Sequence, residues 1–187
     1  TLDNAKVKEI EQYYDQCEAQ GANEHQIEES QKAVAQMEAI IGDPDRLCAV
    51  AKDFIHHYET RVAEGAMVAG KAMFVCMNRN IAYDLYKIIV EMRPQWSEKK
   101  ISDDETALTD KEKKELKPIE KIKLVMTRNK DDEPALYEML GTKDDRKEFD
   151  RQFKNPKSNF KIAIVVDMWL TGFDVPELDT IYIDKPI

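Results

Sequence analysis

The chain has 187 residues, 42% hydrophobic and 35% charged, with a formal net charge of −9 at pH 7. This composition excludes a disordered chain, and no apolar run is long enough to cross a membrane. The acidic balance argues against strong DNA binding by this piece alone, because phosphate contacts need clustered Lys and Arg side chains. A DNA-contacting face built from hydroxyl groups, backbone N–H groups and a few cations remains compatible with it.

The three cysteines, Cys17, Cys48 and Cys76, form no CxxC pair, and their odd number leaves one unpaired in any disulfide scheme. Reduced thiols in a cytosolic protein are the simplest interpretation, and no signal peptide is recognisable. The chain starts at Thr1 without a Met and ends inside a predicted strand. We therefore expect a fragment of a cytoplasmic protein.

Residues 1–66 are predicted to form a helical linker or annex. Apolar residues recur at helical spacing over residues 7–17 and 27–41. A third helix is signalled by Asp43 as N-cap and Pro44 at the first helical position. Its apolar face continues from residue 47 to residue 62, and a glycine at position 65 follows as a stop signal.

The pattern changes near residue 70 to short apolar strands that alternate with helices. The predicted strands are residues 71–77, 122–126, 161–166 and 180–184, and the first reads as buried on both faces. The predicted helices begin near Asn80, as N-cap, and at residues 134 and 143. Residues 97–117 are predicted to be an exposed, mobile loop. This alternation predicts an α/β fold with a parallel sheet flanked by helices.

The most informative segment follows the third strand, where chemistry collects in parallel sheets. Thr171 offers a hydroxyl group, Gly172 permits close backbone approach, and Asp174 offers a carboxylate. Such a loop could hold a phosphate, but spacing alone favours a tight turn in which Asp174 caps the next element. Trp169 in the same segment is predicted to anchor the loop to the core, with stacking on a ligand as the alternative.

Two strings resemble a known family. DMWLTGFDVPELDTIYIDKP (residues 167–186) looks like motif V of superfamily 2 helicase-like motors, in the form found in type I restriction enzyme R subunits. GKAMFVCMNRNIAYDLY (residues 70–86) is similar to the motif IV strand and helix of the same subunits, and the KLVMT strand (residues 123–127) also fits. The likeness is clear from about residue 39 to residue 187.

The resemblance implies a second RecA-like domain over residues 67–187, truncated before motif VI and before its last strands. It implies that Thr171, Gly172 and Asp174 couple the ATP cleft to DNA. It also implies that Met77, Asn78 and Arg79 line the DNA-tracking side. Arg79 is the expected phosphate ligand, and a solvated Arg at a helix start is the alternative.

Several parts of the motor are absent from this sequence. It contains no GxxxxGK[ST] loop to cradle phosphates and no strand-end Asp-Glu pair to hold Mg²⁺. ATP and Mg²⁺ are therefore expected only in the full-length protein, and the fragment alone should hold no complete catalytic site. A metal site at His56 and His57 is disfavoured because adjacent helical residues do not share a face. A nuclease-like set of Asp179, Asp184 and Lys185 is disfavoured because Asp184 and Lys185 are neighbours in a strand and point to opposite faces.

The resemblance therefore implies the ATP-dependent DNA-translocating and DNA-cleaving R subunit of a type I site-specific deoxyribonuclease. Its partners would be duplex DNA and the methylation and specificity subunits, in the cytoplasm of a bacterium or archaeon, with no membrane. One alternative is another superfamily 2 DNA motor. The other is a noncatalytic helicase-like docking domain, which the acidic charge and the missing ATP motifs would suit.

Overall fold

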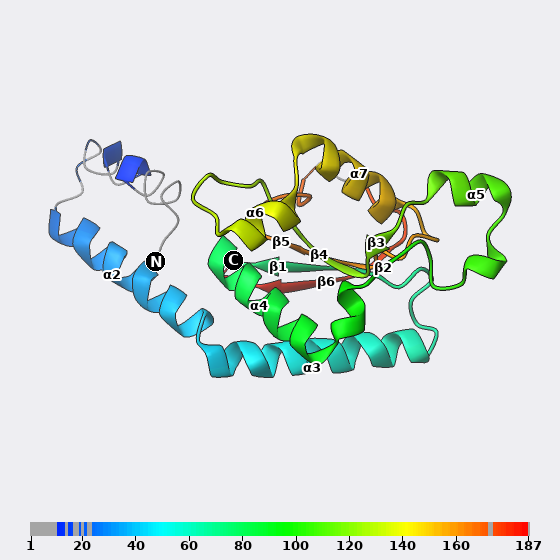
Figure 1. Cartoon of the computed structure of the whole chain (residues 1–187). Coiled ribbons are helices and arrows are strands. Elements are labelled where there is room, and N and C mark those ends of the chain that lie inside the picture. Colours follow the sequence, from blue (N-terminus) through cyan, green and yellow to red (C-terminus); the bar gives the residue numbers. More distant parts are fainter. Residues whose placement is uncertain are drawn as a thin grey trace.

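The computed structural model describes residues 11–13, 15–16, 19, 21, 24–171 and 174–186. The apolar positions expected in the first helix at Val7, Ile10, Tyr14 and Cys17, and the glycine at position 172, lie outside the described residues. Figure 1 shows a central sheet with helices on both sides and a long helix that leads away from it.

The central sheet has four parallel strands in the order β4, β5, β1, β6. Their bounds are β1 Lys71–Cys76, β4 Ile122–Val125, β5 Ile162–Val165 and β6 Leu178–Asp184. Each of the first three is buried along its whole length, because helices or chain segments cover both faces of the sheet. The predicted α/β fold with a parallel sheet is confirmed.

Helices cover the two faces unequally (Figure 1). One face packs against α3 (Pro44–Ala63), α4 (Arg79–Met92) and α6 (Pro134–Leu140), which contribute to one hydrophobic cluster with the sheet. The other face packs against α7 (Lys143–Lys154) and the segment that follows β5. This three-layer arrangement leaves the loops at the carboxyl ends of the strands at one edge of the molecule.

Helix α3 begins as its sequence predicts and belongs to the core. Asp43 accepts a hydrogen bond from the Arg46 backbone N–H at 3.0 Å, and Pro44 is the first helical residue. Five of its side chains are buried: Leu47, Ala51, Phe54, Ile55 and Tyr58. By contrast α2 (Glu24–Ile41) buries none of its residues. The proposed division near residue 66 stays a prediction, but α3 packs directly on the sheet.

The prediction of a loop over residues 97–117 is wrong in its secondary structure. The segment contains η2 (Glu105–Ala107) and α5 (Asp110–Glu115), and β2 (Lys99–Lys100) pairs antiparallel with β3 (Ile119–Glu120). Preceding it, η1 (Pro94–Ser97) buries Trp96. A capping box between Thr109 and Glu112 starts α5. Local caps and two buried leucines, Leu108 and Leu116, order a stretch whose composition alone looks like solvated loop.

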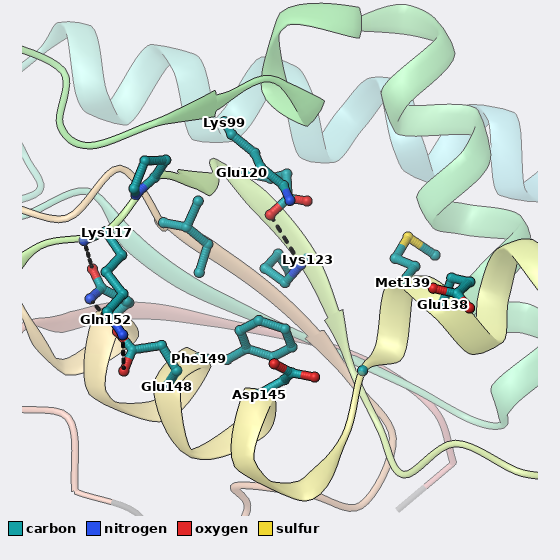
Figure 2. A pocket seen from close by; sticks show the side chains of 13 residues that line it. Lys99, Lys117, Glu120, Lys123, Glu138, Met139, Asp145, Glu148, Phe149 and Gln152 are labelled. Carbon is teal, nitrogen blue, oxygen red and sulfur yellow. Dashed lines mark hydrogen bonds and ion pairs between the residues drawn. The ribbon is translucent and has the colours of Figure 1, made fainter.

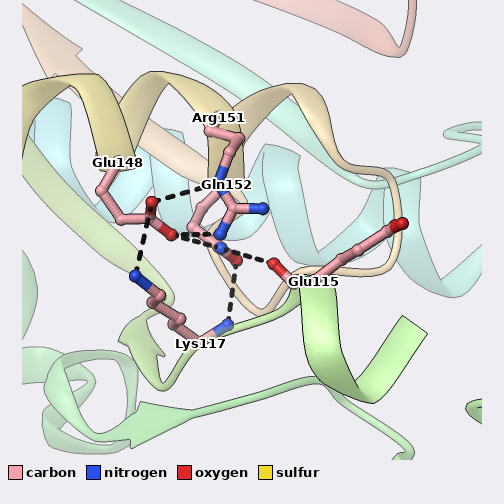
Figure 3. A network of polar contacts seen from close by, with 5 residues as sticks. All are labelled: Glu115, Lys117, Glu148, Arg151 and Gln152. Atoms are coloured by element: carbon pink, nitrogen blue, oxygen red, sulfur yellow. Dashed lines mark hydrogen bonds and ion pairs between the residues drawn. The ribbon is translucent and has the colours of Figure 1, made fainter. Parts of the chain in front are cut away.

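A polar network ties this segment to α7 (Figure 3). Gln152 is 1% exposed and donates hydrogen bonds to the Glu115 carbonyl at 3.3 Å and to Glu148 at 2.8 Å. Its side-chain oxygen Oε1 accepts from the Lys117 backbone N–H at 3.4 Å. Glu148 also pairs with Arg151 and lies 3.7 Å from the Lys117 ammonium. Neighbouring cations and the Gln152 amide lower the pKa of Glu148, the Arg151 bond being the largest cause.

Replacing Gln152 with Ala should lower the free energy of unfolding by about 1–3 kcal/mol, because buried backbone partners would lose their hydrogen bonds. Urea denaturation of the chain measures this. Lys147→Ala is the control, since that side chain is 69% exposed on the same helix. Equal stabilities of the two variants would show that the network does not anchor the segment.

Candidate functional site at the carboxyl edge of the sheet

The carboxyl ends of four parallel strands meet at one edge, where most of the predicted site residues lie. Met77 and α4 follow β1, residues 126–133 follow β4, residues 166–177 follow β5, and Lys185 follows β6. Because β5 pairs directly with β1, the segments carrying the motif IV and motif V strings leave neighbouring strands.

Met77 and Asn78 have roles inside the fold. Met77 is half-buried against the main hydrophobic cluster. Asn78 is 9% exposed, and its side-chain oxygen accepts from the Ile81 backbone N–H at 2.9 Å. Its amide donates to Glu38 of α2 at 3.3 Å. Asn78 is therefore the N-cap of α4, and the prediction of Asn80 as N-cap is wrong by two residues.

Arg79, the predicted phosphate ligand, is held by the segment that follows β4. Its Nη2 lies 2.7 Å from each carboxylate oxygen of Asp132, and its Nη1 donates to the Thr127 carbonyl. The Arg79 and Asp132 side chains are only 12% and 9% exposed. The alternative of a solvated arginine is therefore wrong. The role of Arg79 towards DNA stays a prediction.

The same segment has a second contact with α4. Tyr83 donates a hydrogen bond to Glu133 at 2.6 Å, which raises the pKa of Tyr83 to about 12. The Asn129 backbone N–H donates to Asp132 at 2.7 Å, so the loop also fixes this carboxylate from its own backbone. Asp132 and Glu133 were not among the predicted site residues. The acidic run of residues 131–133, just beyond a buried strand, was the available signal.

The motif V segment turns back over the second face of the sheet. Trp169 has a φ of +64° and stacks on Phe153 of α7, with ring centroids 5.4 Å apart and 21° between the planes. It also lies 6.4 Å from the Phe160 ring. The prediction of Trp169 as a core anchor is confirmed. Thr171 and Asp174 are both exposed. Their role in coupling ATP to DNA stays a prediction.

The carboxyl end of β6 is joined to the start of α3. Arg46 pairs with Asp184 through both guanidinium nitrogens, one at 3.0 Å, and the hydrogen bond to Asp184 raises the pKa of Arg46. Asp179 lies near the other end of this strand and Asp184 at its last residue. A strand advances about 3.3 Å per residue, so the two carboxylates are too far apart to hold one ion. This geometry does not fit a nuclease-like set of Asp179, Asp184 and Lys185.

His57 of α3 packs against Tyr182 of the same edge strand, β6. Its Nδ1 lies 2.6 Å from the Tyr182 hydroxyl, and the two rings meet edge to face at 5.5 Å. The two residues line a shallow, mainly apolar hollow of about 330 Å³ between α3 and β6. Among the described residues, no group of three or more His, Cys, Asp or Glu side chains could hold a metal ion.

A second hollow of about 300 Å³ lies between β3, β4 and α7 (Figure 2). Lys123 is 4% exposed there, pairs with Glu120 at 3.0 Å and lies 4.3 Å from the Phe149 ring centroid. Burial lowers the pKa of Lys123, although Glu120 opposes the shift. Three lysines and four carboxylates line this hollow, so their charges largely compensate. It is distinct from the carboxyl edge, and no predicted site residue lines it.

Comparison with known proteins identifies the family. The model of type I restriction enzyme subunit R domain 3 matches residues 69–187. The chain belongs to this family. It is 34% identical over 160 residues to the type I restriction enzyme HindI endonuclease subunit of Haemophilus influenzae, covering 86% of this chain and 13% of that protein.

An archaeal relative extends the match within the type I R-subunit family. The provisionally named type I restriction enzyme MjaIXP endonuclease subunit of Methanocaldococcus jannaschii is 35% identical over 180 residues, or 95% of this chain. The chain spans 13% to 16% of the length of the curated relatives that it matches. Within the described residues, no helix is long and apolar enough to span a membrane.

Proposed function

We propose that this chain is part of an ATP-dependent, DNA-translocating and DNA-cleaving R subunit. It would supply the motif IV and motif V half of a cleft between two RecA-like domains. The observation that carries the proposal is the family match over residues 69–187, which contain both motif strings. Ligands of open α/β sheets bind beyond the carboxyl ends of the strands, and both strings lie there.

The residues of this chain would couple DNA contact to the ATP cleft. Thr171 and Asp174 are exposed on the segment after β5, and Gly172 lies between them. The Thr171 hydroxyl would donate to a backbone phosphate, and the Asp174 carboxylate would orient a cation or a hydroxyl group across the cleft. Trp169, stacked on Phe153, would hold the segment against the sheet.

ATP and Mg²⁺ would be bound by the full-length protein. The described residues contain no cluster able to hold a metal, and the sequence contains no phosphate-cradling loop. The residues present do not fit a complete ATP and Mg²⁺ site, because positioned phosphates, a metal and a compensating cation are all needed for phosphoryl transfer. The partners would be duplex DNA and the methylation and specificity subunits, with the whole complex in the cytoplasm.

A noncatalytic docking domain is the second candidate. One observation favours it: Asp132 neutralises Arg79, the predicted phosphate ligand, in a chain of net charge −9. Such a domain would keep the fold without coupling it to ATP hydrolysis. Another superfamily 2 DNA motor is disfavoured because the matched family is that of type I R subunits.

Asp174→Ala in the full-length R subunit should reduce DNA-stimulated ATPase activity by at least about tenfold, or about 1.4 kcal/mol of transition-state stabilisation. ATP binding should be retained, because no phosphate-cradling residue is changed. The measurement compares ATP hydrolysis with and without duplex DNA. Its control is Asp144→Ala, a carboxylate 89% exposed on α7.

The outcomes separate the candidates. Unchanged stimulation in the Asp174 variant would remove the coupling role but leave the motor function. No DNA-stimulated hydrolysis by the well-folded wild-type R subunit, even with the methylation and specificity subunits present, would overturn the motor and favour the docking domain.

A further inference from the structure

The Arg79–Asp132 pair is the most buried charged contact at the candidate site. One guanidinium nitrogen lies 2.7 Å from both carboxylate oxygens, and the other donates to the Thr127 carbonyl. Both side chains are about nine-tenths buried. The guanidinium therefore has to leave Asp132, at least in part, before it can turn its planar fork towards an external anion.

Asp132 is fixed independently of Arg79. The Asn129 backbone N–H donates to one of its oxygens at 2.7 Å, within a tight turn of the same loop. The next residue, Glu133, accepts from Tyr83 at 2.6 Å and ties the loop to α4. The carboxylate consequently stays in place when the arginine moves, and the ion pair can form again when the arginine returns.

A carboxylate and a phosphate offer a guanidinium the same arrangement of paired oxygens, so they compete for the same N–H groups. We propose that Asp132 is an internal competitor of the DNA phosphate, holding Arg79 in the unbound state until DNA displaces it. This inference rests on the proposed function. Arg79 can therefore lie on the DNA-facing side of the domain and still be paired with Asp132 when no DNA is bound. DNA gains the Arg79 contact only where other contacts already hold the duplex.

The test uses the full-length R subunit and a fluorescent duplex, with binding measured by anisotropy at fixed salt. Asp132→Asn keeps an oxygen for the Asn129 N–H but removes the negative charge, and it should tighten binding about fivefold. Asp131→Asn is the matched control, because Asp131 is the adjacent exposed carboxylate. It should change affinity by less than about twofold, because salt screens exposed charges.

A double-mutant cycle isolates the competition. Arg79→Gln should weaken binding, and Asp132→Asn should have no further effect in the Arg79→Gln background. The proposal would be overturned if the Asp132 and Asp131 variants gained DNA affinity equally, or if the Asp132 variant still gained affinity without Arg79. Either result would attribute the effect to the net charge of the protein. An Asp132→Asn variant that binds DNA more weakly, with an unchanged melting temperature, would also overturn the proposal. Asp132 would then position Arg79 for the phosphate and not compete with the phosphate.

Three further cases can be told apart. If Asp132→Asn does not fold, Asp132→Ser keeps an acceptor for the loop N–H and carries the same prediction. If the folded wild-type R subunit binds no duplex DNA at all, the proposed function fails together with the inference. If it binds DNA and neither Arg79→Gln nor Asp132→Asn changes the affinity, only the inference fails.

Discussion

Replacing Lys71 with Met should remove a rise in stability between about pH 6 and pH 10. Lys71 is the first residue of β1 and is fully buried. Its Nζ donates to the Phe160 carbonyl, lies 3.5 Å from the Gln152 carbonyl, and faces the Phe153 ring at 5.3 Å. Burial, with a smaller contribution from Lys161, lowers the pKa of Lys71 from 10.5 to about 6.

The sign of the pH effect follows from proton linkage. Between the two pKa values the unfolded chain binds a proton at Lys71 that the folded chain has released, so raising the pH favours folding. Below about pH 6 both states are protonated, and the full destabilisation by the buried charge is present. Each pH unit within the window is worth at most about 1.4 kcal/mol.

The wild-type free energy of unfolding should therefore rise by about 2–3 kcal/mol more than that of Lys71→Met between pH 6.5 and pH 9. Urea denaturation at several pH values measures both slopes. Lys147→Met is the control, because that side chain is 69% exposed. Parallel curves for wild type and Lys71→Met would show that the buried amine does not gain its proton on unfolding in this range.

Phe54→Ala should cost about 3–5 kcal/mol of stability, the usual range for deleting a buried phenylalanine. Phe54 is 3% exposed on α3 and meets Phe74 of β1 and Tyr182 of β6 edge to face, at centroid distances of 5.3 and 4.8 Å. The deletion would open a cavity between the helix and two strands. Such a loss is a large share of the total stability of a typical domain.

This variant also tests the division near residue 66. If residues 67–187 fold independently, Phe54→Ala should change stability little, and a chain starting at residue 67 should unfold cooperatively. The structure predicts the opposite, because α3 supplies five buried residues to the core of the sheet. Val62→Ala, at a position 44% exposed on the same helix, is the control for a general loss of helix stability.

Much of the fold was predictable because its signals are local. The apolar runs that become β1, β4 and β5 mark strands buried on both faces, and the structure has them within a residue or two. Asp43 and Pro44 fix the start of α3 through a cap and a fixed φ. The motif strings identify the family, and the family match covers both of them.

Capping was harder to predict where two candidates lie close together. Asn78 and Asn80 are both plausible caps for α4, and the extended backbone of Asn78 decides between them. Residues 97–117 have few apolar groups, and their order depends on Gln152 of α7 and on pairing with β3. The composition of residues 97–117 predicts neither contact, because both partners lie elsewhere in the chain.

By itself the sequence determined the α/β class, the buried strands, the first turn of α3 and the family, since each rests on short-range spacing or on a contiguous string. Only the tertiary structure decided what the charged residues do. Arg79 meets Asp132 across 53 positions, and Arg46 meets Asp184 across 138. Side chains so far apart in sequence are brought together by the parallel crossovers of the sheet, and no local pattern specifies which carboxylate each arginine will bind.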